Sequence, residues 1–187
     1  MKSEIRREIL ERRKYLDENL WIEKSIKVQK TLIEKDFYKN TSSILVYCYF
    51  DKEVMTDIII NDALEKNKVV CIPYNEWEAQ TFIPSRIYSV EDIDRTKKIP
   101  QPFKKNPFPP ESIQVAIIPG VAFDIYGSRI GMGKGFFDKF LKIANRDMLK
   151  VSLAFDFQVL DKKLPVDIWD QKVDIIITET RVIKTSI

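Results

Sequence analysis

The sequence predicts a layered α/β fold with a mostly parallel central sheet and helices on both faces. Apolar runs of strand length alternate with amphipathic helical segments through most of the 187 residues. This alternation is typical of parallel strands joined by helical crossovers, which cover both faces of the sheet. Neither an internal repeat nor a linker interrupts the pattern, so we expect a single domain over residues 1–187.

Two helices are predicted at the N-terminus, over residues 2–18 and about 20–36, because apolar residues recur there at helical spacing. The residues expected to pack inward are Ile5, Ile9, Leu16 and Leu20 in the first helix and Ile22, Ile26, Leu32 and Ile33 in the second.

Strands and helices alternate in the rest of the chain. Five prolines between residues 99 and 112 predict a loop, since each proline lacks a donor and restricts the residue before it. The predicted strands cover residues 43–50, 69–73, 81–83, 115–119, 151–155 and a pair near 173–184, and further helices cover about 55–66 and 136–146.

The composition excludes several kinds of chemistry and of partner. Histidine is absent, which excludes Ser-His-Asp and Cys-His centres and histidine-bound zinc. The net charge of +3 is too small to indicate nucleic-acid binding. The N-terminus lacks the apolar region of a secretory signal, and no apolar run reaches the roughly 18 residues of a membrane span. We therefore expect a cytoplasmic protein, acting as a monomer without membrane or nucleic-acid partners.

The two cysteines, Cys48 and Cys71, lie within strand-like apolar runs. Buried free thiols in a reducing compartment are the simpler interpretation, and a single disulfide is the alternative.

The glycines are concentrated in one segment, IIPGVAFDIYGSRIGMGKGFFDKFLKIA. All five of them lie between residues 120 and 135 (Gly120, Gly127, Gly131, Gly133 and Gly135). A G-x-G-x-G loop that enters a helix presents backbone N–H groups at the positive end of the helix dipole, which favours phosphate binding. Arg129 and Lys134 add positive charge there, and Asp138 adds a carboxylate suited to magnesium. The alternative is a tight turn, with Asp138 as an ordinary first-turn acid.

The spacing of this loop differs from both common nucleotide motifs. It lacks the Lys-Ser/Thr ending of a P-loop and the G-x-G-x-x-G spacing of the dinucleotide fingerprint. The nucleotide interpretation therefore depends on the glycine cluster and its flanking charges.

The N-terminal helix adds basic residues. Lys2, Arg6 and Arg13 lie beside its apolar stripe, so a helix docked near the glycine loop could bring Lys2 and Arg6 to phosphate groups. Basic side chains extending along the edge of the core are the alternative.

The segment PGVAFDIYGSRIGMGKGFFDKFL resembles the signature of the 5-formyltetrahydrofolate cyclo-ligases (methenyltetrahydrofolate synthetases). That signature reads Pro-Gly-x-x-Phe-Asp, followed by Gly-x-Arg-Leu-Gly-x-Gly-x-Gly-Tyr-Tyr-Asp. Weaker matches follow the family's order along the chain: Lys2, Ile5, Arg6, Glu53, Thr56, residues 99–102, residues 153–155, Gln158, Leu164, Pro165, Asp170, Val173 and Asp174.

The resemblance implies closure of 5-formyltetrahydrofolate to 5,10-methenyltetrahydrofolate, with ATP and Mg²⁺, on a CoA-transferase-like α/β fold. It implies that ATP phosphorylates the formyl oxygen, that N10 closes the ring, and that phosphate and ADP are released. The folate could carry a polyglutamate tail.

Site residues are carried over by position. Lys134 and Arg129 would be catalytic cations, Asp138 and Asp170 would hold Mg²⁺, and the proline-rich loop around Gln101 and Pro102 would border the folate pocket. ATP would be bound by Lys2, Arg6, Arg129, Ile130, Gly131, Met132, Gly133, Lys134, Gly135, Phe136 and Phe137, and folate by Cys48, Phe50, Glu53, Met132 and Phe136. Trp77 and Trp169 could be aromatic residues of the pocket, and packing at the core or the rim is the preferred interpretation for both.

Several residues depart from the family pattern. Phe136 and Phe137 stand where tyrosines are usual, and Met132, Trp169 and Gln101 replace Tyr or Arg, His and Glu respectively. These changes affect substrate contacts and leave the proposed phosphate and metal groups in place.

Two other functions fit part of the pattern. One is a non-catalytic relative that binds folate or nucleotide, and the other is a sugar-phosphate isomerase-type enzyme on a similar sheet. Lys2, Arg6 and Asp170 argue against the isomerase, which needs neither ATP nor a second carboxylate for magnesium.

Overall fold

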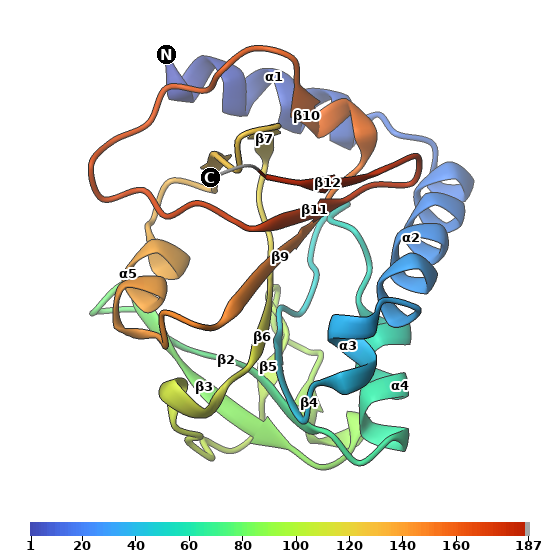
Figure 1. Cartoon of the computed structure of the whole chain (residues 1–187), viewed down its shortest axis with the longest axis vertical. Coiled ribbons are helices and arrows are strands. Elements are labelled where there is room, and N and C mark those ends of the chain that lie inside the picture. Colours follow the sequence, from blue (N-terminus) through green and yellow to red (C-terminus); the bar gives the residue numbers. More distant parts are fainter. Residues whose placement is uncertain (186–187) are drawn as a thin grey trace.

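The computed structural model describes residues 1–185 and has a central seven-stranded sheet (Figure 1). Its strand order is β12-β11-β9-β6-β1-β2-β3. The strands are β1 (Ser43–Val46), β2 (Val69–Glu76), β3 (Thr81–Ile87), β6 (Val115–Ile118), β9 (Leu149–Leu153), β11 (Ile175–Ile177) and β12 (Val182–Lys184). The inner pairings are parallel, and only the edge strands β3 and β12 pair antiparallel. The prediction of a mostly parallel sheet is confirmed.

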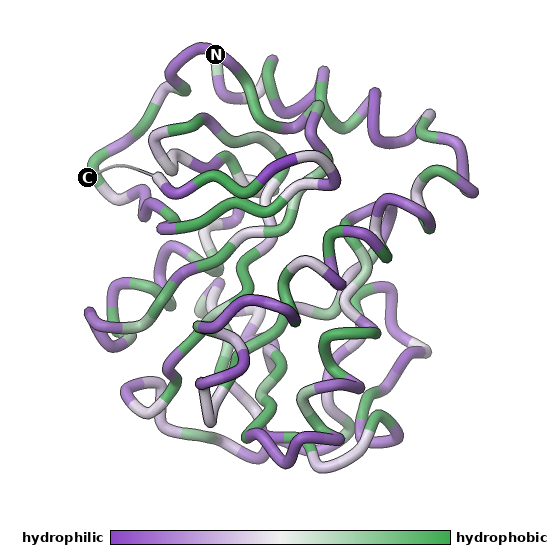
Figure 2. Tube along the Cα trace, turned by 45° about the vertical axis from the view of Figure 1, so that its right-hand side comes forward, coloured by the Kyte–Doolittle hydropathy of each residue, from purple (hydrophilic) through white to green (hydrophobic). Residues whose placement is uncertain are grey.

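Helices cover both faces of this sheet, as predicted. In β1, Ile44 and Val46 contact the core under α2 (Glu18–Ile33), α3 (Asp36–Asn40) and α4 (Asp57–Glu65). Leu45, between them, contacts the opposite core under α5 (Phe136–Ile143). Successive residues of a strand point to opposite faces, so a strand covered on both sides is apolar throughout. Figure 2 shows the resulting run of hydrophobic residues along the central strands.

A smaller sheet lies beside the main one and supports the first helix. It has the order β10-β7-β8, formed by β10 (Val159–Leu160), β7 (Ala122–Asp124) and β8 (Arg129–Ile130). Ile5 and Ile9 of α1 (Lys2–Lys14) pack against Val121, Ala122 and Ile130 of this region. The inward face predicted for the first helix is therefore confirmed at Ile5 and Ile9, and α1 is docked against the glycine segment.

The boundary between the first two helices lies earlier than predicted. Helix α1 ends at Lys14 and α2 begins at Glu18, because the Asp17 side chain accepts a hydrogen bond from the Leu20 N–H (3.2 Å) and caps α2. Leu20 therefore belongs to α2 and is exposed. The prediction that it packs inward from the first helix was wrong.

The inward face predicted for α2 was also wrong in part. Ile22 and Ile26 are exposed, and Ser25 and Gln29 are buried with Val28 and Leu32. The Gln29 Oε1 atom accepts hydrogen bonds from the N–H groups of Ile58 and Ile59. This polar face of α2 therefore accepts hydrogen bonds from the free N–H groups at the N-terminus of α4. Hydrophobic spacing does not reveal such a role.

Several other boundaries differ from the predictions. Strand β1 stops at Val46, β2 and β3 form a longer hairpin, β9 begins at Leu149, and α5 ends at Ile143. Part of the glycine segment that was predicted as loop is the β7–β8 hairpin, and the proline-rich segment contains β5 (Gln101–Pro102), paired with β4 (Ile93–Asp94). Three-residue 3₁₀ helices cover Val90–Asp92, Pro110–Ser112 and Asp156–Gln158.

Cys48 and Cys71 are both buried free thiols, as predicted. Within residues 1–185, no helix has the length and apolar character needed to cross a bilayer.

Candidate active site

A cavity of about 660 Å³ lies at the carboxyl ends of β1 and β6. Tyr47 and Cys48 directly follow β1, and Pro119 and Gly120 directly follow β6, and all four line the cavity. The carboxyl edge of parallel strands is the usual place for a ligand site in α/β proteins. The residues predicted from the sequence to bind ATP, folate or Mg²⁺ line this cavity: Lys2, Arg6, Cys48, Phe50, Glu53, Arg129, Ile130, Gly131, Met132, Gly133, Lys134, Gly135, Phe136, Phe137, Asp138 and Asp170.

The glycine loop enters α5 as the sequence predicted. Gly135 is the N-cap of α5 and has a φ of 72°, in the left-handed region that favours glycine. Gly133 has a φ of 98°, and a Cβ atom there would lie 3.4 Å from the Arg6 guanidinium carbon. The loop and the first helix therefore meet at this point.

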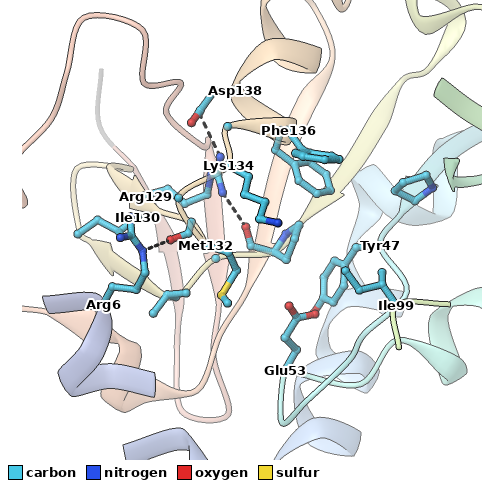
Figure 3. A pocket seen from close by; sticks show the side chains of 18 of the residues that line it. Arg6, Tyr47, Glu53, Ile99, Arg129, Ile130, Met132, Lys134, Phe136 and Asp138 are labelled. Atoms are coloured by element: carbon cyan, nitrogen blue, oxygen red, sulfur yellow. Dashed lines mark hydrogen bonds and ion pairs between the residues drawn. The ribbon is translucent and has the colours of Figure 1, made fainter. Parts of the chain in front are cut away.

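Arg129 and Arg6 hold the glycine loop in place (Figure 3). The Arg129 side chain is buried, and its Nη1 and Nη2 atoms donate to the Pro119 carbonyl (3.0 Å) and to Asp138 Oδ1 (3.1 Å). Burial lowers the pKa of Arg129, and the Asp138 carboxylate opposes this effect. Arg6 Nε donates to the Gly131 carbonyl (2.7 Å). These contacts leave the N–H groups of the loop available to a ligand anion.

Lys2 connects α1 to the loop that follows β10. Its Nζ atom forms ion pairs with Asp167 Oδ2 (2.6 Å) and with Asp170. Burial opposes ionisation of Lys2, but the two carboxylates outweigh it and raise its pKa. Asp170 also accepts a hydrogen bond from the Asp167 N–H (2.7 Å). Lys2 and Asp170 are therefore brought together at the cavity, with Asp167 as a third partner.

Lys134 is the cation of the loop that lacks a carboxylate partner. Its Nζ atom lies 5.5 Å from the centre of the Trp77 ring. Among residues 1–185, no acidic side chain is within ion-pair distance of it. Its charge is therefore free to meet an incoming anion, and Figure 3 shows the side chain extending into the cavity.

The opposite wall of the cavity is more apolar and contains Glu53. In Figure 3, Glu53, Tyr47 and Ile99 lie on one side, and Arg6, Arg129 and Met132 lie on the other. Glu53 is buried, and this burial raises its pKa to about 7, with the Arg13 charge acting against the increase. Burial also raises the pKa of the Cys48 thiol to about 12, so Cys48 contributes an uncharged surface.

Sequence reasoning missed several lining residues, among them Tyr47, Asn75, Lys98 and Asp167. Tyr47 lies in the middle of the predicted strand 43–50, and it reaches the cavity because β1 stops at Val46. Asn75 and Lys98 come from segments whose position depends on the tertiary fold. The segment predicted to border the cavity contributes residues 98–100 rather than Gln101 and Pro102.

Trp77 and Trp169 lie at the rim, each 53% exposed, and both also line the cavity. Both the rim placement and the pocket placement considered for them are therefore confirmed.

The donor set fits magnesium better than a transition metal. Within residues 1–185, no group of three or more His, Cys, Asp or Glu side chains is placed to hold a metal ion. Asp138 and Asp170 both line the cavity, and both charges act on Arg129. One or two carboxylates supplemented by phosphate oxygens and water is the set that Mg²⁺ prefers.

Known proteins resemble this chain over nearly its full length. The model of the 5-formyltetrahydrofolate cyclo-ligase family matches residues 1–179. The 5-formyltetrahydrofolate cyclo-ligase of Mus musculus is 26% identical over 189 residues, covering 95% of this chain and 93% of the relative. That of Haemophilus influenzae is 30% identical over 144 residues, covering 74% and 75% respectively.

Solved structures agree with this relationship. The NMR structure of Aquifex aeolicus 5,10-methenyltetrahydrofolate synthetase is 32% identical, has a TM-score of 0.86, and covers 100% of this chain and 93% of its own. A 5,10-methenyltetrahydrofolate synthetase structure from Mycoplasma pneumoniae, 23% identical with a TM-score of 0.78, shares the fold. The match over residues 1–179 and the cavity built from the signature residues lead to one conclusion: the chain belongs to the 5-formyltetrahydrofolate cyclo-ligase family.

Proposed function

We propose that this single-domain protein converts 5-formyltetrahydrofolate to 5,10-methenyltetrahydrofolate, with ATP as the phosphoryl donor and Mg²⁺ as the metal. One observation carries the proposal: the loop Gly131–Phe137 with its free cation Lys134 and the apolar wall with Glu53 line the same cavity. A phosphate donor and a heterocyclic acceptor can therefore bind next to each other, which is the main requirement for catalysing phosphoryl transfer.

The reaction then proceeds in two steps. The formyl oxygen attacks the γ-phosphorus of ATP, and the bond from phosphorus to the ADP oxygen breaks. N10 next attacks the activated carbon, loses its proton, and displaces the oxygen as inorganic phosphate. Mg²⁺, held by Asp138 and Asp170, would neutralise phosphate charge. Lys134 would stabilise the charge on the transferred group, and Arg6 and Arg129 would keep the loop amides oriented.

The direct test is to follow absorbance after mixing the protein with ATP, Mg²⁺ and 5-formyltetrahydrofolate. The methenyl product has a longer conjugated system than the substrate and absorbs at longer wavelength. An increase that requires both ATP and the protein supports the proposal. No ATP-dependent increase with folded protein would refute it and leave a non-catalytic binding role.

ATP and Mg²⁺ are expected to bind cooperatively. Without ligand, Asp138 is paired with Arg129, and Asp170 with Lys2, so a metal ion would compete with a cation for each carboxylate. Phosphate groups can replace those carboxylates as partners of Lys2 and Arg129. We expect Mg²⁺ to tighten ATP binding by at least about fivefold in calorimetry, a modest allosteric coupling. Equal affinity with Mg²⁺ and with EDTA would contradict this partner exchange.

The left-handed backbone at Gly135 is expected to matter for both stability and ATP binding. Gly135→Ala places a Cβ in open space but keeps the unfavourable positive φ, at a cost of about 1 kcal/mol in unfolding free energy. Relief of that strain turns the loop amides and weakens ATP binding. The matched control is Asn67→Ala, at a φ of 57° outside the cavity, which should lose similar stability with unchanged ATP affinity. Urea unfolding and calorimetry measure both quantities, and equal ATP affinity in the two variants would contradict the role of Gly135.

A further inference from the structure

Arg13, in the last turn of α1, is buried to an unusual degree for a charged side chain. It is 2% exposed, and among residues 1–185 its Nη2 atom has no hydrogen-bond partner. The nearest carboxylate is that of Asp51, 3.8 Å from Nη2, and the Asp51 side chain is 63% exposed. The sequence places Arg13 beside the apolar stripe of the first helix, and the structure buries its side chain instead of extending it along the edge of the core. A buried guanidinium is costly unless a charge compensates it.

The compensating charge lies across a small internal void. Arg13 and Glu53 both line this void, together with Tyr47 and Gln158, and it is too small to hold a water molecule. The other polar groups are already paired, since the Tyr47 hydroxyl donates to the Val54 carbonyl and Gln158 Nε2 donates to the carbonyls of Gly120 and Val121. Arg13 and Glu53 therefore border one void with no room for water, and the Arg13 charge acts on Glu53 where charges interact more strongly than in water.

Glu53 in turn faces the ligand cavity. It lines the large cavity as well as the small void, and it is 7% exposed. Its carboxylate receives one long hydrogen bond, from the Phe50 N–H at 3.4 Å. Glu53 is thus a weakly bonded acceptor at the folate end of the cavity, with Arg13 behind it.

We propose that Arg13 is a positioning residue that favours the ionised form of Glu53, so that Glu53 can accept hydrogen bonds from N–H groups of the bound heterocycle. The proposal rests on the proposed function for the identity of the heterocycle. The interaction between Arg13 and Glu53 itself is a property of the protein without ligand. It can be tested whether or not the enzyme turns over.

The charges around Glu53 determine whether a substitution raises or lowers the pKa of Glu53. Burial raises the pKa of Glu53 to about 7, the Arg13 charge lowers it, and the Asp51 charge raises it. The nearby Tyr47 hydroxyl stays protonated, because burial raises its pKa as well. Removing the Arg13 charge should therefore move the Glu53 titration to higher pH, and removing the Asp51 charge should move it to lower pH.

The decisive measurement is an NMR titration of carboxyl-labelled glutamate, with the Glu53 signal identified by its loss in Glu53→Gln. Arg13→Gln should raise the Glu53 midpoint by about one pH unit or more, whereas Arg13→Lys should keep it near the wild-type value. If Arg13→Gln fails to fold, Asp51→Asn at the exposed carboxylate should still lower the midpoint. Unchanged midpoints in Arg13→Gln or in Asp51→Asn would overturn the proposal.

A kinetic readout separates positioning from general loss of structure. In Arg13→Gln, the KM for 5-formyltetrahydrofolate should rise at neutral pH and recover as pH increases and Glu53 ionises, with a smaller change in kcat. Glu53→Gln should have a high KM at every pH, and Arg13→Lys should restore the wild-type profile. A pH-independent loss in Arg13→Gln would indicate a structural role only. Inactive wild-type protein would refute the proposed function, and the NMR titration would still decide the role of Arg13.

Discussion

Lys134→Ala is expected to lower the turnover of 5-formyltetrahydrofolate by about 10²- to 10³-fold, the usual effect of removing one charge-stabilising group from an active site. Lys134 is exposed and has no ion pair within residues 1–185, so its ammonium group is available to the phosphoryl group as charge develops on it. Rates at saturating substrates, together with the KM for ATP, measure the effect. A loss mainly in kcat would place Lys134 at the transition state.

Lys142→Ala is the matched control for this variant. Lys142 is an exposed lysine on α5, in the same helix that the loop enters, and it does not line the cavity. Neither variant should change the unfolding free energy by more than about 0.5 kcal/mol, because both side chains are at the surface. Near-normal turnover in Lys134→Ala, or an equal loss in Lys142→Ala, would contradict the assignment of Lys134.

The sequence predicted the part of the site that is contiguous along the chain. Residues 129–138 form one strand, one glycine loop and the first turn of one helix, and each local geometry has a signal in residue type or spacing. The glycines at positions 133 and 135 are such signals, since few other residues accept the positive φ values found there. The inward face of α1 was also predictable, because Ile5 and Ile9 define a clear apolar stripe, whereas its docking against the glycine loop was one of two alternatives.

The rest of the site depends on contacts between distant segments. Lys2, Arg6 and Arg13 share one helical spacing. Arg6 contacts the glycine loop and Lys2 pairs with Asp170, whereas Arg13 is buried behind Glu53. The difference follows from the loop after β1, in which Asp51 and Lys52 contact the last turn of α1. In α2, Ser25 and Gln29 face inward because the N-terminus of α4 needs acceptors there. Hydrophobic periodicity does not predict which backbone N–H groups require a side-chain acceptor.

Asp138→Asn is expected to remove turnover and also to destabilise the fold. The amide keeps the shape of the side chain but loses the charge needed for Mg²⁺ and for Arg129, whose guanidinium is buried. Removing one partner of a buried ion pair typically costs about 3 kcal/mol or more. We expect a fall of that order in urea unfolding, together with loss of the Mg²⁺-dependent increase in ATP affinity.

Asp170→Asn separates the effect on Mg²⁺ binding from the effect on the free energy of unfolding. Asp170 shares Lys2 with Asp167, so Lys2 keeps a carboxylate partner in this variant, and the loss of stability should be below about 1 kcal/mol. If both aspartates hold Mg²⁺, both variants lose turnover and the coupling between Mg²⁺ and ATP, while only Asp138→Asn loses much stability. If Asp138 serves only to hold Arg129, Asp138→Asn would be unstable but still respond to Mg²⁺. The Mg²⁺ dependence of ATP binding in the two variants therefore distinguishes a metal ligand from a partner of Arg129.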